Sequence, residues 1–168
     1  MENTGIYHSD SSQTVKYAGF WWRFLAYLID EIVMSFILSI IFVPAFAIMG
    51  ISMWAIVEGN VQPEHEEIVA GSMALVGLFT GATAVIIQWL YFAIMESSKS
   101  QGTLGKLALR IKVTDYSGNR VSFGRATGRY FGKIVSSFIL LIGYIMAGFT
   151  AKKQALHDMM AGCLVIKD

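Results

Sequence analysis

The sequence predicts an all-α integral membrane protein with two long transmembrane helices, a third apolar segment and a small cytoplasmic β patch. Of its 168 residues, 55% are hydrophobic and only 15% are charged, whereas a soluble domain carries about 25% charged residues. The mean hydropathy is +0.55, and the apolar residues gather in long uncharged stretches. This composition excludes a disordered chain, a disulfide scaffold and an ordinary cytosolic enzyme.

Two stretches are long enough to cross a bilayer, which requires about 20 apolar residues in a helix. The first predicted helix covers about 20–50, and we expect Pro44 to bend or end it. The second covers about 68–96 and contains 28 consecutive uncharged residues. The apolar segment 134–151 is shorter, with 18 uncharged residues. It is either a short third span or a re-entrant hairpin bent near Gly143.

The distribution of basic residues predicts the orientation of the chain. We expect residues 1–15 to form a flexible tail and residues 16–168 to form one membrane domain. The loop 51–67 contains four acids and no Lys or Arg, whereas segment 97–133 contains eight basic residues and one acid. Because Lys and Arg concentrate in cytoplasmic loops, segment 97–133 and the N-terminus are predicted to lie in the cytoplasm, in a cell (inner) membrane.

A small sheet is predicted beside the membrane. Cys163–Lys167 is typical of a short strand, and its best partner is Arg110–Thr114. A turn at 116–119 allows Val121–Phe123 to return as a further strand. Because the partner strands are cytoplasmic, this patch favours a cytoplasmic C-terminus and the hairpin interpretation of segment 134–151.

Asp30 is the first candidate for a functional residue, because a carboxylate within a spanning segment costs about 3 kcal/mol or more at the bilayer centre. Arg23 precedes it by seven residues, which places both on one helix face and allows a direct or water-bridged contact. The pair either fixes helix packing or forms a protonatable, cation-binding group. Glu31 is rotated by about 100° and faces another neighbour.

Small residues at four-residue intervals indicate close helix contacts, within one copy or between copies. The predicted packing positions are Gly77 and Gly81 in the second helix, and Gly124, Gly128 and Gly132 in the helix that opens the last third of the chain.

A basic stripe lies beside the second group of glycines and contains Arg125, Arg129 and Lys133. One interpretation is an interfacial helix whose basic face meets anionic headgroups. The other is that Arg129 or Arg125 pairs with an acid in the membrane.

Catalytic and metal-binding patterns are lacking in the sequence. Segment Gly102–Lys106 does not have the glycine spacing of a phosphate-binding loop, and the acidic run Glu64–Glu67 does not match a zinc motif. No nucleophile stands at a readable spacing from a base. We therefore expect no enzymatic activity, no metal and no cofactor, and the net charge of +1 argues against a nucleic-acid partner.

In order and combination, several segments resemble the RDD family of small membrane proteins, which is named for one arginine and two aspartates. The resemblance implies that Arg23, Asp30 and Asp158 are the name residues, and that transport is suspected. Secondary candidates are Glu31, Glu96, Arg129 and His157. The matching segments are 17–30, 91–96, 102–106, 111–118, 126–129 and 154–162.

Two functions remain open at this point. The first is a transporter that exchanges a monovalent cation for protons at Asp30, with Arg23 tuning its charge. Two or three helices cannot enclose a polar path, so this hypothesis requires a homo-oligomer in the lipid bilayer. The alternative is a non-catalytic membrane scaffold or assembly subunit that binds a partner protein or anionic lipid.

Overall fold

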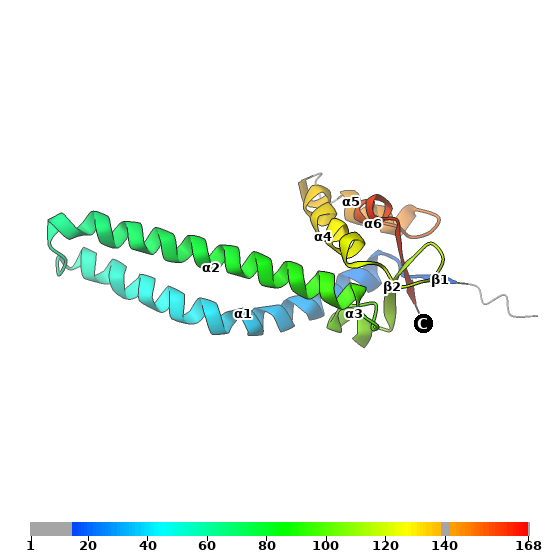
Figure 1. Cartoon of the computed structure of the whole chain (residues 1–168), viewed down its shortest axis with the longest axis horizontal. Helices are drawn as coiled ribbons and strands as arrows, with labels where there is room; N and C mark the ends of the chain where they lie inside the picture. The colour runs from blue at the N-terminus through cyan, green and yellow to red at the C-terminus, as the bar shows by residue number, and fades with distance from the viewer. Residues whose placement is uncertain (1–14, 139–141, 168) are drawn as a thin grey trace, which may run out of the picture.

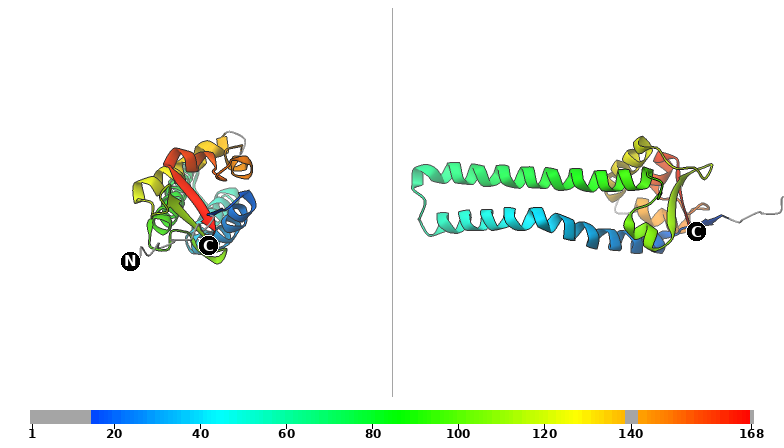
Figure 2. Two further views of the ribbon diagram at one scale, coloured as in Figure 1. Left: turned by 90° about the vertical axis from the view of Figure 1, so that its right-hand side faces the viewer. Right: turned by 60° about the horizontal axis from the view of Figure 1, so that its bottom comes forward.

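The computed structural model describes residues 15–138 and 142–167. They form a long helical hairpin that carries a cluster of short helices and a small sheet at one end (Figure 1). The hairpin consists of α1 (Phe20–Val57) and α2 (Pro63–Ser97). The two helices lie side by side in both directions of view (Figures 1 and 2). The predicted fold class, mostly helical with two spanning helices and a small sheet, is confirmed.

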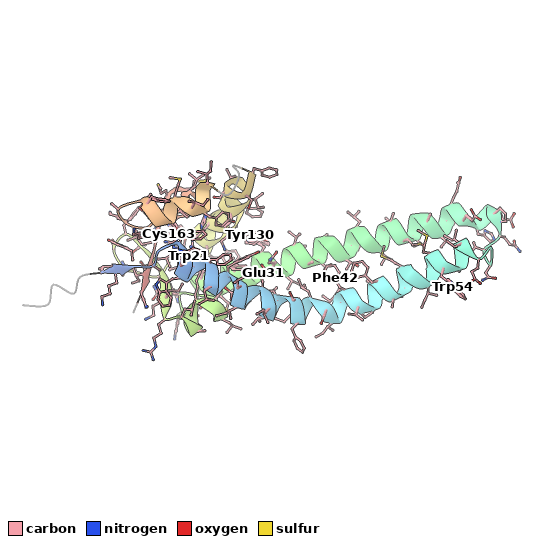
Figure 3. The ribbon with its side chains drawn as sticks, turned by 180° about the vertical axis from the view of Figure 1, so that it is seen from behind. Trp21, Glu31, Phe42, Trp54, Tyr130 and Cys163 are labelled. Carbon is pink, nitrogen blue, oxygen red and sulfur yellow. The ribbon has the colours of Figure 1, made fainter. Side chains whose placement is uncertain are left out.

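Helix α1 extends seven residues beyond the predicted end near residue 50, and Pro44 lies inside it without ending it. A proline removes one backbone donor, but a chain in hydrocarbon has no water with which to satisfy a broken ladder. The remaining apolar residues therefore stay helical as far as Val57. In Figure 3, Phe42 and Trp54 lie along this outer part of α1, far from Cys163 at the other end.

Helix α2 begins at Pro63, five residues before the predicted start. Proline fits the first helical position because its missing N–H would have no partner there. Glu64 and Glu66 follow in the first turn, where acidic side chains interact favourably with the helix dipole. The acidic run that the sequence analysis assigned to the loop is thus the opening turn of α2.

Both hairpin helices are apolar enough to cross a membrane. In α1 the 26 residues from Ile32 to Val57 carry no charge, a length of roughly 39 Å at about 1.5 Å per residue. The hydrocarbon core is about 30 Å thick. Asp30 and Glu96 lie just beyond the uncharged stretches of their helices, so the charged end of the hairpin lies at one edge of the hydrocarbon.

The third apolar segment belongs to two helices. α4 (Phe123–Phe138) and α5 (Ile142–Phe149) are inclined by 103° to each other, as in a broken span or a re-entrant loop. Residues 139–141 between the two helices lie outside the described residues, and Gly143 lies within α5. A Cβ at Gly143 would lie 2.7 Å from the Cβ of Ser136, so a glycine permits the close approach of α4 and α5.

The sheet contains three antiparallel strands in the order β1-β3-β2. They are β1 (Lys16–Tyr17), β2 (Ile111–Asp115) and β3 (Cys163–Lys167). The predicted pairing of the C-terminal strand with the segment near 110–114 is confirmed, with Val113 opposite Val165.

The prediction of a returning strand at Val121–Phe123 is wrong. Phe123 opens α4, and an isolated bridge joins Thr114 to Arg120. Val121 is buried in the core, because the chain turns under the sheet there to begin the helix. The third strand is β1, which was missed because two residues are too few to show an alternating pattern.

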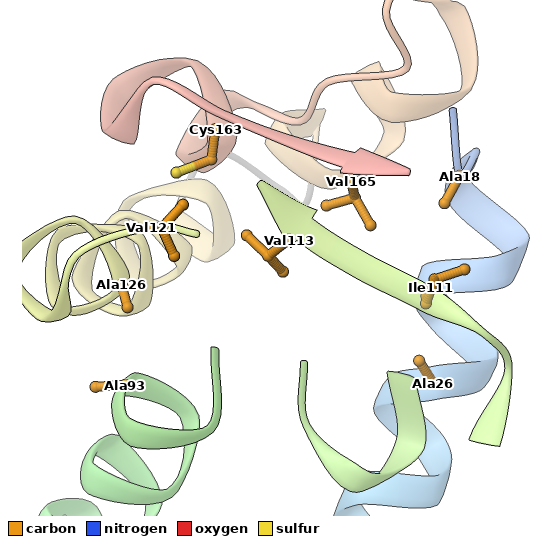
Figure 4. Packing of buried hydrophobic residues seen from close by; sticks show 9 residues of the cluster. All are labelled: Ala18, Ala26, Ala93, Ile111, Val113, Val121, Ala126, Cys163 and Val165. Atoms are coloured by element: carbon orange, nitrogen blue, oxygen red, sulfur yellow. The ribbon is translucent and has the colours of Figure 1, made fainter. Parts of the chain in front are cut away.

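The buried core lies beneath this sheet and joins it to the hairpin (Figure 4). Val113 and Val165 from the strands pack with Ala26 of α1 and Ala93 of α2. The small side chains on the long helices let the sheet approach closely. Two short helices complete the unit, α3 (Leu104–Ala108) and α6 (Leu156–Ala161), and α3 packs on α1.

Candidate functional site

A chain of ion pairs links five helices at the charged end of the hairpin. Arg129 of α4 stands at its centre, with its Nη1 2.8 Å from Glu96 Oε2 and its Nε 2.7 Å from Asp158 Oδ1. Lys106 of α3 donates to the other oxygen of Glu96. Arg23 of α1 donates to the other oxygen of Asp158. Each carboxylate therefore holds two cations.

This ion-pair chain is buried. The side chains of Asp158, Glu96 and Arg129 are at most 2% exposed, and that of Arg23 is 12% exposed. Buried ion pairs contribute little net stability, but removing one member leaves an uncompensated buried charge at a cost of about 3–5 kcal/mol. The chain therefore makes the arrangement of the five helices highly specific.

Arg23 does not contact Asp30, contrary to the contact that their spacing suggested. Its Nε donates to the carbonyl of Ala18 at 2.8 Å, and its Nη2 donates to the carbonyl of Lys153 at 2.5 Å. With Nη1 on Asp158, every nitrogen of the guanidinium has a partner. The name residues of the family resemblance, Arg23 and Asp158, thus pair with each other.

Asp30 is buried and holds α3 against α1. Its carboxylate accepts hydrogen bonds from Thr103 Oγ1 at 2.5 Å, Tyr91 Oη at 2.8 Å and the Gly105 amide at 2.8 Å. Tyr91 Oη in turn accepts the amide of Leu104 at 3.1 Å. These three neutral donors compensate the carboxylate in place of a cation.

Gly105 is required by this arrangement. A Cβ at this position would lie 2.1 Å from the carbonyl oxygen of Ala26 and 3.0 Å from Asp30 Cγ. Real Cβ atoms do not approach a backbone oxygen so closely, so any other residue would push α3 away from α1. The glycine therefore sets the distance at which its own amide reaches Asp30.

Asp158 also opens α6, because its Oδ2 accepts the amide of Ala155 at 3.0 Å. Burial tends to raise the pKa of this carboxyl, but Arg129 and Arg23 outweigh it and hold the pKa well below its usual range. Asp158 is therefore fixed as an anion. Elsewhere in the ion-pair chain, burial lowers the pKa of the Lys106 ammonium, although Glu96 opposes the shift.

His157 precedes this carboxylate and is also buried. Its Nδ1 lies 3.4 Å from Ser136 Oγ, and its ring lies 5.1 Å from that of Tyr144. Burial lowers the pKa of His157 to about 3, and Asp158 only partly opposes this effect. The imidazole is therefore neutral near pH 7, and it packs α6 against α4 and α5.

A cavity of about 390 Å³ opens beside the ion-pair chain, between α1, α4 and α5. Arg23, Lys106, Arg129 and Lys133 contribute positive charge to its wall, and Asp30 contributes a carboxylate. The rest of the wall is mainly aromatic. Across the described residues, no three His, Cys, Asp or Glu side chains are grouped so that they could hold a metal ion.

Lys133 differs from the other cations of the cavity. Its Nζ lies 3.9 Å above the ring of Phe92. Within residues 15–138 and 142–167, no carboxylate lies within ion-pair distance of it. A cation over an aromatic face gains only a modest attraction. Burial lowers the pKa of the Lys133 ammonium to about 7, and Glu96 only partly opposes this effect, so a bound anion would favour the charged form.

Three of the four secondary candidates lie in or beside the ion-pair chain, as described above. They are Glu96, Arg129 and His157. Glu31 lies apart from it and accepts a hydrogen bond from Gln88 Nε2 at 3.3 Å. Figure 3 shows Glu31 near the charged end of the hairpin, by Tyr130.

For the basic stripe, the interpretation in which Arg129 pairs with an acid agrees with the structure. Arg129 is 2% exposed, so it does not meet headgroups, whereas Arg125 is exposed.

The predicted packing glycines have unequal surroundings. A Cβ at Gly132 would lie 3.1 Å from His157 Cβ, so α6 crosses α4 at this residue. The side chain nearest to Gly77 is Met49, at 3.8 Å. No described atom lies within 4 Å of a Cβ built at Gly81, Gly124 or Gly128. The expectation of a close contact within one copy is therefore wrong at these three positions.

Three important side chains were missed by the sequence analysis, namely Thr103, Lys106 and Tyr91. The segment Gly102–Lys106 was rejected as a phosphate-binding loop and was otherwise noted only for its family resemblance, with no role for its side chains. Its actual signal is a short turn of helix in which a lysine, a glycine and a threonine each face a buried acid. Such a signal appears only when the acids are known to lie nearby.

Comparison with known proteins identifies the family of this chain. The RDD family model matches residues 17–162, which include every member of the ion-pair chain. The uncharacterised protein YxaI of Bacillus subtilis strain 168 is 42% identical over 155 residues, covering 90% of this chain and 97% of its own length. The uncharacterised membrane protein YteJ of the same organism is 29% identical, covering 92% of this chain and 84% of its own. No solved structure matches this chain. The chain therefore belongs to the RDD family.

Proposed function

We propose that this protein is a non-catalytic membrane scaffold. The hairpin of α1 and α2 anchors it in the bilayer. The ion-pair chain holds the sheet and the short helices as a fixed unit at one membrane face, where a partner protein binds. The observation that supports this proposal is that the three acids buried in the described part of the chain, Asp30, Glu96 and Asp158, all have committed partners.

Committed partners favour a structural role over ion exchange. A carboxylate that exchanges a cation for a proton must present free oxygen atoms to the ion and must change protonation during the cycle. Both oxygens of Glu96 and of Asp158 face cations. Asp30 receives three hydrogen bonds. A cation entering the cavity would also meet four positively charged side chains.

Cation–proton exchange is the second candidate, and the position of Asp30 favours it. Asp30 lies in a spanning helix at the edge of the hydrocarbon, and it lines the cavity. Thr103 and Tyr91 bind it through hydroxyl groups, which rotate readily and could release an oxygen atom. A single hairpin encloses no polar path, so exchange would also require a homo-oligomer.

Ion flux in proteoliposomes separates the two candidates. A trapped pH dye follows the response to sodium, lithium and potassium pulses for wild type, Asp30→Asn and the exposed control Glu66→Gln. The scaffold predicts no response in any of the three, and a lower unfolding temperature for Asp30→Asn alone. A cation-driven pH change in wild type that disappears in a folded Asp30→Asn protein would overturn the scaffold and support exchange.

We further propose that the charged end faces the cytoplasm in the cell membrane. The excess of Lys and Arg in segment 97–133 supports this orientation, and β3 joins the C-terminal segment to the same sheet. In a Cys163→Ser background, an impermeant maleimide should label Asn60→Cys in intact cells. It should label Ser117→Cys only after lysis. The reverse pattern would contradict the proposal.

A further inference from the structure

The geometry points to a binding site for a singly charged phosphate group in the cavity beside the ion-pair chain, with Lys133 as its principal donor. The ligand class is a phosphate oxyanion with an apolar body, as in an anionic phospholipid. This site goes beyond the scaffold role, because it concerns what the cavity itself accepts.

The cavity wall is electropositive because the ion pairs are oriented. Arg23, Lys106 and Arg129 all line the cavity, whereas their carboxylate partners, Glu96 and Asp158, are absent from its lining among the described residues. The acids therefore lie behind the cations. The acid that does line the cavity, Asp30, already accepts three hydrogen bonds. A ligand in the cavity thus meets donors more than acceptors.

The charges of the ion-pair chain and of the cavity wall leave one positive charge without a carboxylate when Lys133 is protonated. The ion-pair chain has three cations and two carboxylates. Lys133, when protonated, adds a positive charge and Asp30 adds a negative one. With His157 neutral, the groups of the ion-pair chain and of the cavity wall then sum to +1. A charge withdrawn from water is costly unless it is paired. One monoanion would complete the pairing.

Lys133 is the group best placed to bind that anion. The other three cations donate to carboxylates, while the ammonium of Lys133 lies over the ring of Phe92. Phe92 covers one side of the ammonium, and the N–H donors that do not face the ring remain available to a ligand in the cavity. A charge-assisted hydrogen bond from such a donor to a phosphate oxygen is short and strong.

The remaining wall fits an apolar body next to the phosphate. Phe20, Phe24, Tyr27, Tyr144 and Ile145 line the cavity, and a mainly apolar pocket with a few placed polar groups is typical of small-molecule sites. The cavity also lies beside Asp30 and Lys106, at the edge of the hydrocarbon. Lipid phosphates occupy this depth of a bilayer.

Native mass spectrometry of the full-length chain in detergent tests the site with defined probes. Dihexanoyl phosphatidylglycerol has a net charge of −1. Dihexanoyl phosphatidylcholine has the same phosphate, but its quaternary ammonium makes the net charge zero, and inorganic phosphate has no apolar body. We expect one phosphatidylglycerol per chain, bound in preference to phosphatidylcholine. Lys133→Gln should weaken this binding about tenfold, as for the loss of one charge-assisted contact. The exposed control Lys99→Gln should leave it unchanged.

The variants separate binding from folding. Lys133 lies outside the ion-pair chain, so Lys133→Gln should keep the wild-type unfolding temperature in detergent, and Lys133→Arg should retain lipid binding. Bound phosphatidylglycerol that survives millimolar inorganic phosphate assigns the site to lipid, whereas full competition assigns it to free phosphate. Equal binding of the two lipids, equal binding by wild type and Lys133→Gln, or no binding of either anion would overturn the proposal.

Discussion

Arg23 and Asp158 are 135 residues apart in the sequence and form a buried ion pair. The pair joins the first turn of α1 to the first turn of α6. Asp158 also binds Arg129 of α4 at 2.7 Å. This one carboxylate therefore connects α1 of the hairpin with both α4 and α6. Two of the three residues that the family resemblance singles out thus serve a single contact, and the third, Asp30, serves another contact with α3.

Asp158→Asn should destabilise the protein strongly, because it leaves two buried arginines facing a neutral amide. The expected loss is about 3–5 kcal/mol in the free energy of unfolding, measured by denaturant titration in detergent. Arg23→Gln should cost less, since Asp158 then keeps Arg129. The exposed change Glu66→Gln is the control. Equal stability of Asp158→Asn and wild type would contradict the structural role of the chain.

Cys163 offers a direct readout of the same variant. It is the single cysteine of the chain, it is buried in β3, and burial raises the pKa of its thiol. Alkylation by a maleimide should therefore be slow in wild type and fast in Asp158→Asn. The thiol reports whether the sheet remains docked.

Acid should weaken the fold through His157 before it affects Asp158. The folded state holds the pKa of His157 at about 3, against 6.5 for the free side chain. Between these values the unfolded chain binds more protons, so stability falls as the pH falls. From pH 6.5 to 5 the loss is up to about 2 kcal/mol. The depressed pKa of Asp158 removes further stability only below about pH 4.

Thermal unfolding of His157→Gln across this pH range checks the assignment. Glutamine keeps a polar group near Ser136 but does not titrate, so the variant should lose the slope between pH 6.5 and 5. His65→Gln changes an exposed histidine and should retain the slope. A wild-type unfolding temperature that is constant over this range would show that His157 does not control acid stability.

The sequence was sufficient for the membrane helices because their signal is local. An uncharged stretch such as Ile32–Val57 is long enough by itself to identify a span. The pairing of β2 with β3 also followed from two short apolar strands. The partners of Arg23 did not follow, because helix periodicity relates residues within one helix and says nothing about a carboxylate 135 residues away. Lys106 was missed for the same reason, since its partner Glu96 lies in another helix.

Gly105→Ala should be among the most damaging small changes in the chain. The new methyl group would lie 2.1 Å from the carbonyl oxygen of Ala26, and a backbone atom in a packed helix cannot move aside. α3 would shift, and both the Asp30 hydrogen bond and the Lys106–Glu96 pair would weaken. Overpacking typically costs about 1–3 kcal/mol, and more where backbone is involved.

Gly128→Ala in α4 is a matched control, because no described atom lies within 4 Å of its new methyl group. It should leave stability unchanged or raise it by up to about 1 kcal/mol, since alanine favours a helix interior. Denaturant titrations should therefore show a loss of stability for Gly105→Ala alone, and a Gly105→Ala protein as stable as wild type would show that α3 is not held against α1.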